Sequence, residues 1–416
     1  MFRVTKRKFI AMSSGAVAGG LISGNATAGS ETSDYEYEVW ALDQSDNNNI
    51  HIYTPDSEED DGFVEEDVLD LDSIDVDNSI ERPHMIDFSS DGEYAVVANT
   101  VSGNIAIIHS DSRDVIEILD TGPGSHFGGF TPDDEYIHVD VIGTSEIVRV
   151  DADLEKEAFE IVDEIEINEN IDGLTEEEGS PVCHEFDNNG RSIHTLGPSY
   201  HDAGVVIVDH DEFEVVEAWG GDDLPANCGT MPHPNKNKFY LTAGLPSDPD
   251  GDEDGVGEYY VLHTPPGRGD QRGRGAGTRI HRDGVSTEGI DAHGIFPVES
   301  KDEMWIVNRE TNDGVIVDLN NNKVKETIDT FGPADHEEPA ESDAPDILWS
   351  SPDDEYMFGT LRGPNPLSGD PHAATGVNPG FAVWDVESRD RVATVQPAGD
   401  DEDADFHGIG VRDVDR

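Results

Sequence analysis

A degenerate sequence repeat is the feature of this 416-residue chain that most limits how it can fold. Each copy has a histidine-containing apolar segment, a turn such as SSDG, and two further β-rich segments separated by a loop. The second segments are YEVWAL (37–42), YAVVAN (94–99), YIHVDV (136–141), SIHTLG (192–197), FYLTAG (239–244), MWIVNR (304–309) and YMFGTL (356–361). The third segments are IHIYTP, IAIIHS, IVRVDA, VVIVDH, YYVLHT, VIVDLN and FAVWDV, which begin at residues 50, 105, 147, 205, 259, 315 and 381.

The repeat predicts an all-β fold. Short segments rich in Val, Ile, Tyr and Phe, broken by Gly, Pro, Asp and Asn, are typical of strands joined by tight turns. Four strands per unit form one blade of a β-propeller, so seven units predict a seven-bladed β-propeller of four-stranded blades. The chain enters on a second-type strand, and HGIGVRDV (407–414) has the pattern of a first-type strand. We therefore expect the C-terminal strand to complete the N-terminal blade, which leaves no open edge.

Three segments resemble a known group of propellers. SSPDDEYMF (350–358) and FTPDDEYIHV (130–139) are similar to the turn-and-strand signature of the YVTN-repeat and cytochrome d1-like family, and residues 361–386 resemble a stretch of the same group. The resemblance implies a single propeller over residues 35–416. It implies no particular activity, because this architecture serves enzymes, metal carriers and interaction modules.

The first residues predict export. Residues 1–28 contain four basic and no acidic side chains, an apolar Gly- and Ala-rich stretch, and a terminal ATA, as in a secretory signal. TKRKFI (5–10) is similar to a twin-arginine signal with Lys in place of the first Arg. After a short linker at 29–34, no apolar run is long enough to span a membrane. We expect a monomer outside the cell or on its surface, released or anchored.

The charge excludes one class of function and indicates an environment. The formal net charge is −67, and the acidic residues are spread between apolar runs rather than confined to a tail. A chain this acidic lacks the basic surface that nucleic acid requires. The spread is typical of a protein adapted to high salt, in which screening reduces self-repulsion.

A histidine stands near the start of most first-type strands. In a propeller this strand runs from the top face down the central channel, so its first residues surround the channel mouth. His184 stands two residues nearer its turn than His84 and His126 do, which keeps it on the same face about 7 Å deeper. The predicted ring is His84, His126, His184, His293, Asp346 and His407, with Met231 or His233 in the fifth unit.

Three interpretations of this ring stay open. Imidazoles from several strands can hold one Zn²⁺ or Cu²⁺ ion, for a carrier, a chaperone or a surface binder. The ring can instead be polar lining of a metal-free propeller that binds a protein through its top loops. In the third, a lactonase-like hydrolase, His84 or His293 acts as general base, Glu185 or a metal polarises water, and Arg309 or Arg362 holds an anionic substrate.

The long insertions support a top-face site. They fall at residues 168–182, 244–257, 332–344 and 362–379, and bring His336, Arg309, Arg362 and His372 toward the same mouth. Insertions gathered on one face usually mark the face that binds a small ligand or a partner.

Other motifs are few. Cys183 and Cys228 are the only cysteines, and an even pair in an exported chain predicts a disulfide. Asp250, Asp252 and Asp254 fit the start of a calcium loop, but Val261 stands where the bidentate Glu belongs, so we expect no Ca²⁺ there. The sequence has no CxxCH, no G-x-S-x-G and no phosphate-binding glycine loop, which predicts neither haem nor nucleotide.

Overall fold

The computed structural model describes residues 36–414 apart from residues 57–58, 60–61, 75–78, 176–178, 198–203, 227, 249–253, 267–276, 329–341, 369–373 and 400. The predicted export segment and linker lie outside the described residues. So do four of the candidate site residues, namely His336, His372, Asp250 and Asp252.

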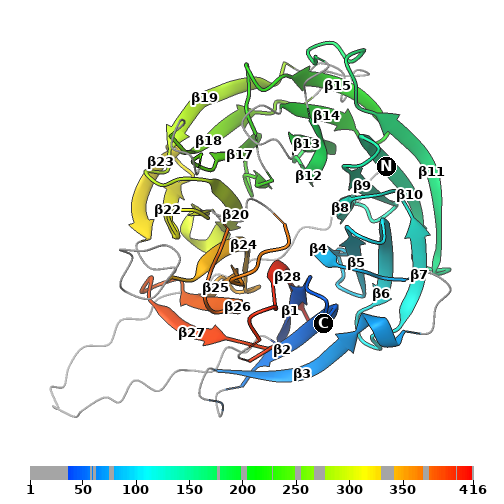
Figure 1. Ribbon diagram of the computed structural model, residues 1–416. Helices are drawn as coiled ribbons and strands as arrows, with labels where there is room; N and C mark the ends of the chain where they lie inside the picture. Colours follow the sequence, from blue (N-terminus) through cyan, green and yellow to red (C-terminus); the bar gives the residue numbers. More distant parts are fainter. Residues whose placement is uncertain are drawn as a thin grey trace, which may run out of the picture. The chain divides into compact units, whose positions relative to one another are not determined.

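The described residues form seven four-stranded antiparallel sheets arranged as the blades of a propeller (Figure 1). We number the blades from the N-terminus, and each is given from its innermost strand outward. Blade 1 consists of β28 (Phe406–Asp413), β1 (Tyr37–Asp43), β2 (Asn49–Pro55) and β3 (Phe63–Asp70), and blade 2 of β4 (Pro83–Phe88), β5 (Tyr94–Asn99), β6 (Asn104–His109) and β7 (Val115–Asp120). Blade 3 consists of β8 (Ser125–Phe130), β9 (Tyr136–Val141), β10 (Glu146–Asp153) and β11 (Ala158–Glu166), and blade 4 of β12 (Ser180–Phe186), β13 (Arg191–Gly197), β14 (Val205–Asp209) and β15 (Glu214–Trp219).

The remaining blades continue in chain order. Blade 5 consists of β16 (Thr230–Pro232), β17 (Lys238–Leu245), β18 (Val256–His263) and β19 (Arg279–Ser286). Blade 6 consists of β20 (Ala292–Val298), β21 (Glu303–Asn308), β22 (Asp313–Asp318) and β23 (Lys323–Ile328), and blade 7 of β24 (Ala344–Ser350), β25 (Tyr356–Arg362), β26 (Gly380–Asp385) and β27 (Arg391–Val395). Short 3₁₀ turns occur at η1 (Leu71–Ser73) and η3 (Glu299–Lys301). The prediction of seven four-stranded blades is confirmed.

The repeated turn signature has a direct structural cause. In blade 2 the hydroxyl of Ser89 donates to Asp91 and accepts the N–H of Tyr94, which folds the chain back from β4 into β5. Thr131 makes the same two bonds in blade 3, and Ser351 makes them in blade 7. The fourth turn residue has a positive φ, 71° at Gly92, which explains a Gly or Asp there.

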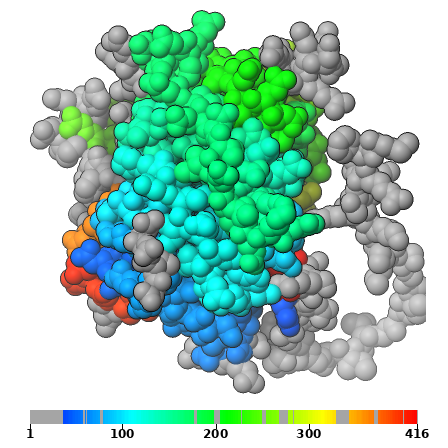
Figure 2. Space-filling view, turned by 90° about the vertical axis from the view of Figure 1, so that its right-hand side faces the viewer, coloured from blue at the N-terminus to red at the C-terminus, as the bar shows by residue number. Residues whose placement is uncertain are grey.

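The core lies between neighbouring blades. The second strands β1, β5 and β21 are buried along their whole length, whereas the outer strand β11 is mostly exposed. One apolar cluster joins Trp40 and Ile52 of blade 1 to Ile86, Val97 and Ile108 of blade 2. Figure 2 shows the side of the ring turned toward the viewer, where blades that follow one another in sequence lie side by side.

The C-terminal strand closes the ring as predicted. β28 pairs antiparallel with β1, with Val411 opposite Val39 and Ile409 opposite Ala41. Blade 1 thus combines the two ends of the described chain and has β28 as its innermost strand. Within the described residues, no helix is long and apolar enough to cross a membrane.

Candidate functional site

A β-bulge repeated from blade to blade builds the ring at the channel mouth. In β4 the pairing with β5 skips one residue between Pro83 and Met85, so that His84 is the extra residue. The first strands of blades 1, 3, 4, 6 and 7 shift register at the same place. A bulge leaves its extra residue out of the ladder and turns its side chain aside. The aligned residues are His407, His84, His126, Val182, His293 and Asp346 in blades 1 to 4, 6 and 7.

Blade 5 contributes a cysteine to this ring. The N–H of Gly229 donates to the hydroxyl of Thr242 at 3.1 Å, and in blade 7 the N–H of Ile347 donates to Thr360 at 2.9 Å. Ile347 directly follows the ring residue of its blade, so the residue before Gly229, Cys228, holds the ring position of blade 5. Met231 and His233, the two residues expected there, lie further along the chain.

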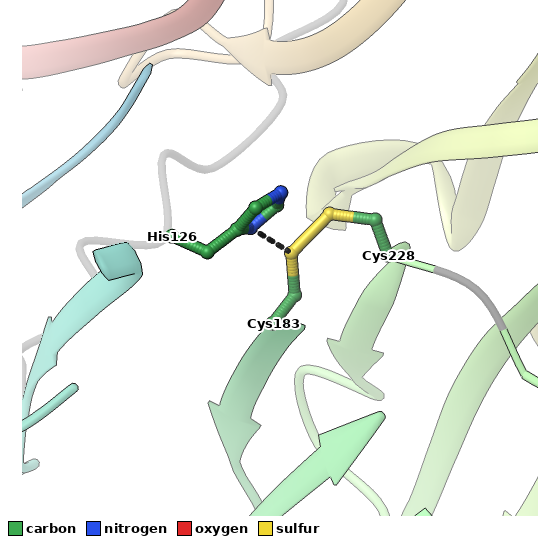
Figure 3. Close-up of side chains that lie close together, drawn as sticks. All are labelled: His126, Cys183 and Cys228. Carbon is green, nitrogen blue, oxygen red and sulfur yellow. Dashed lines mark hydrogen bonds between the residues drawn. A yellow bond between two sulfur atoms is a disulfide. The ribbon is translucent and has the colours of Figure 1, made fainter. Parts of the chain in front are cut away.

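The predicted disulfide is confirmed. Cys228 bonds to Cys183, which directly follows the blade 4 ring residue, and the bridge spans 45 positions of sequence. It therefore joins the innermost segments of two neighbouring blades. The ring of His126 lies against it, with Nδ1 3.7 Å from the sulfur of Cys183 (Figure 3).

Hydrogen bonds fix the tautomers of two ring histidines. The amide nitrogen of Gln44 donates to Asp405 at 2.9 Å, so the amide oxygen of Gln44 faces His84 and accepts its Nδ1–H at 2.8 Å. The Nδ1–H of His126 donates to the carbonyl oxygen of Val182 at 2.8 Å. In the neutral rings Nε2 is therefore the lone-pair atom in both. These two atoms face each other at 2.9 Å.

Burial keeps these rings neutral. Desolvation, then the neighbouring His407 and His126, lowers the pKa of His84 well below its ordinary value. Desolvation also lowers the pKa of His126, to about 4. A hydrogen bond between the two Nε2 atoms would require one ring to carry a second proton, which burial disfavours. In the neutral rings the two Nε2 lone pairs therefore face each other.

His407 is the third imidazole near this pair, although its ring centroid lies 6.3 Å from that of His126. Its ring centroid lies 3.8 Å from that of His84, and it is only 3 % exposed. Its Nε2 lies 3.6 Å from the carboxylate of Asp346, while its Nδ1 has no hydrogen-bond partner among the described residues. Desolvation lowers the pKa of His407 well below its ordinary value, although Asp346 opposes that shift.

Asp346 is the anionic side of the ring. It lies 2.8 Å from Nδ1 of His293 and 2.7 Å from the guanidinium of Arg362. Despite burial, the charges of His407, His293 and Arg362 hold the pKa of its carboxyl well below the ordinary value. Asp346 is thus an ionised group at the edge of the three-imidazole group.

The two predicted arginines do reach this region, but each is paired with acids. Arg309 binds Asp291 at 2.8 Å and lies 3.7 Å from Asp346. Arg362 binds Asp405 at 2.7 Å as well as Asp346, and both guanidiniums are buried. A substrate anion would have to displace these carboxylates, so the geometry disfavours the expected role of Arg309 and Arg362 as substrate clamps.

The structure places His184 elsewhere than the sequence predicted. The bulge in blade 4 falls at Val182, so Val182 and not His184 holds the ring position. The side chain of His184 points instead into the interface between blades 4 and 3. There Nδ1 of His184 and Nδ1 of His194 each lie 2.6 Å from one oxygen of Asp140. All three side chains are completely buried. We call Asp140, His184 and His194 the buried triad; sequence reasoning missed Asp140 and His194.

Glu185, on the innermost strand β12, interacts with Asp87 of β4. It is partly exposed, and burial together with the charge of Asp87 raises its pKa to about 8. Burial also raises the pKa of Asp87 to about 6, even though this carboxylate accepts the N–H of Phe130 at 2.8 Å. These two carboxyls therefore hold a proton near neutral pH.

The remaining candidates lie away from the ring. Met231 packs against the apolar cluster of Tyr240 and Tyr259. His233 is in the turn after β16, where its Nδ1 accepts the N–H of Asn235 and burial lowers its pKa to about 4. Asp254 is exposed, and its two expected calcium partners are outside the described residues.

Comparison with known proteins supports the fold. No family model and no curated protein matches the chain. A solved structure of a protein from Lactobacillus plantarum superimposes with a TM-score of 0.61 at 11% identity, over 91% of this chain and 100% of the other. Dihydro-heme d1 dehydrogenase NirN, in complex with DHE, gives a TM-score of 0.50 at 10% identity, over 90% and 74%. At such identities these likenesses show a β-propeller fold and nothing about activity.

Proposed function

We propose that this protein is an exported, salt-adapted propeller that binds one transition-metal ion, of the Zn²⁺ or Cu²⁺ class, at its channel mouth. The observation that carries the proposal is the pair of Nε2 atoms of His84 and His126, which face each other at 2.9 Å with both Nδ1 atoms committed to carbonyl acceptors. Metal-binding histidines commonly donate their other N–H to a carbonyl or carboxylate in this way.

The third ligand would come from His407, whose Nδ1 has no hydrogen-bond partner among the described residues. Its ring packs on that of His84 but lies 6.3 Å from that of His126, so the ion would have to draw His407 toward the pair. Three neutral imidazoles with an open position form a donor set that suits Zn²⁺ and Cu²⁺. Asp346, which lies 3.6 Å from Nε2 of His407, would then orient this imidazole without binding the ion itself. Because the acids Asp291, Asp346 and Asp405 outnumber Arg309 and Arg362 around it, the group carries negative charge that favours a cation.

The test uses residues 29–416 purified in high salt. Elemental mass spectrometry measures the metal as isolated, and calorimetric titration measures added Zn²⁺ and Cu²⁺. The variant H84Q/H407Q removes two proposed ligands, and H109Q/H263Q removes two histidines outside the ring as a matched control. We expect one bound ion in the parent and the control and none in H84Q/H407Q. A parent that takes up neither metal, or an H84Q/H407Q variant that keeps the ion, would overturn the proposal.

Export and salt adaptation rest on the basic, apolar first 28 residues and on the net charge of −67. Lowering the salt lengthens the range of repulsion between these acids from about 3 Å at 1 M to about 10 Å at 0.1 M. We expect the purified protein to lose stability on dialysis from molar to decimolar KCl, followed by circular dichroism during heating. An unchanged melting temperature would contradict the adaptation to salt.

A further inference from the structure

The disulfide occupies a place in the ring where other blades have metal-binding side chains. Cys228 holds the ring position of blade 5, and Cys183 directly follows that of blade 4. The two sulfur atoms and a ring nitrogen of His126 all lie within 4.8 Å of one another. The close-up shows the imidazole directed toward the bridge, with its three side chains coming from three different blades (Figure 3).

The bridge decides whether these sulfurs can bind a metal. In the disulfide neither sulfur is a thiolate, and the thiolate is the form that ligates metal. A dithiol or phosphine reductant supplies two electrons, and with two protons the S–S bond becomes two thiols. A bound cation then displaces both protons, so that two thiolates and one imidazole surround it. Such a soft donor set selects Zn²⁺ and its thiophilic relatives over hard cations.

The nitrogen of His126 that faces the sulfurs is Nδ1, 3.7 Å from Cys183; it would join the set by giving up its hydrogen bond to Val182, with the ring proton moving to Nε2. The carbonyl oxygen that holds its Nδ1–H belongs to Val182, the residue directly before Cys183. When the bridge opens, the segment that orients the imidazole is no longer tied to blade 5. Cys183 and Cys228 are 3 % and 6 % exposed and His126 is partly exposed, so water competes weakly for an ion at the two sulfurs.

We propose that the Cys183–Cys228 disulfide is a redox gate over a second metal site, in which Cys183, Cys228 and His126 hold a thiophilic divalent cation once the bridge is reduced. The proposal goes beyond the three-histidine site, because it requires neither His84 nor His407. It makes the ligand set around His126 depend on redox state.

Cobalt binding tests the gate. Co²⁺ bound to thiolate absorbs in the near ultraviolet, whereas Co²⁺ bound to imidazole alone lacks this band. We expect the band on adding Co²⁺ to the phosphine-reduced protein and not to the oxidised protein, with mass spectrometry reporting the state of the bridge. The band should weaken in C228S, and H126Q should lower the Co²⁺ affinity of the reduced protein by about tenfold or more. H109Q, which removes a histidine outside the ring, serves as the control.

The outcomes separate the two sites. In H84Q/H407Q the reduced protein should keep the thiolate band, even though the oxidised variant binds no ion. A reduced protein that unfolds or shows no band overturns the gate, as does a band with full affinity in H126Q. If the band persists while the oxidised parent binds no metal, the gate stands and the three-histidine site fails.

Discussion

Two groups of histidines lie close together in this propeller and are built in opposite ways. In the buried triad, Asp140 accepts a hydrogen bond from each of two imidazoles, and all three side chains are inaccessible. In the ring, carbonyl groups hold the Nδ1 atoms of His84 and His126, and their Nε2 atoms face each other at 2.9 Å. In the triad the acid satisfies both imidazoles and acts as a clamp, whereas in the ring the facing lone pairs are left for the ion of the proposed function.

The largest expected effect tests the clamp. Asp140→Ala leaves two buried imidazoles without their shared acceptor, and removing one partner of a buried charged group typically costs about 3–5 kcal/mol. The measurement is the free energy of unfolding by denaturant in high salt. Asp163→Ala, on the exposed strand β11, is the control and should change it by less than about 0.5 kcal/mol. Equal values for the two variants would remove the structural role of the triad.

A smaller loss of stability is expected in the ring. Each of His84→Gln and His407→Gln keeps a polar side chain of similar size, so the unfolding free energy of the metal-free protein should fall by only about 1 kcal/mol. Bound metal, in contrast, should be lost altogether. If either variant lost as much stability as Asp140→Ala, the ring would be a structural network like the triad. The proposed difference between the two histidine groups would then be wrong.

The smallest effect depends on pH and concerns Glu185, the neighbour of His184 on β12. Its folded pKa of about 8 lies above the ordinary value, so the folded state holds a proton that the unfolded chain releases. Stability therefore falls as pH rises from about 4.5 toward 8. Glu185→Gln should have little effect at pH 5 and stabilise the protein at pH 8 by at least about 1.4 kcal/mol, the equivalent of one pKa unit. Denaturant melts of parent and variant at both pH values measure this. A variant less stable at both would show that the channel face and the triad are coupled.

The fold could be predicted from the sequence because its signals are local and repeated. The second strands are short segments rich in apolar and β-branched residues, and in blades 2, 3 and 7 the turn before them needs a hydroxyl, an acid and a residue that tolerates positive φ. These turn residues can be recognised in the sequence even where the rest of the repeat is degenerate. Ring closure followed from counting strand types, and the disulfide from an even pair of cysteines.

The site could be predicted only in part. His84, His126, His293, Asp346 and His407 do share one structural position, but the bulge that creates this position has no sequence signature. One residue of register separates the channel from the blade interface. For this reason the sequence did not predict that His184 belongs to the triad, or that Cys228 holds the ring position of blade 5. Gln44 and Asp405, which orient His84, are far apart in sequence, and no local pattern could pair them.

Strand β28 has a consequence for when the metal site can exist. Two of its proposed ligands, His84 and His126, are synthesised early, while His407 belongs to the strand that is added only after blade 7. A nascent chain, or one truncated before residue 406, can offer only an incomplete ligand set in an open ring. Under the proposed function, possession of the ion would thus report that strand β28 has joined blade 1 and closed the ring.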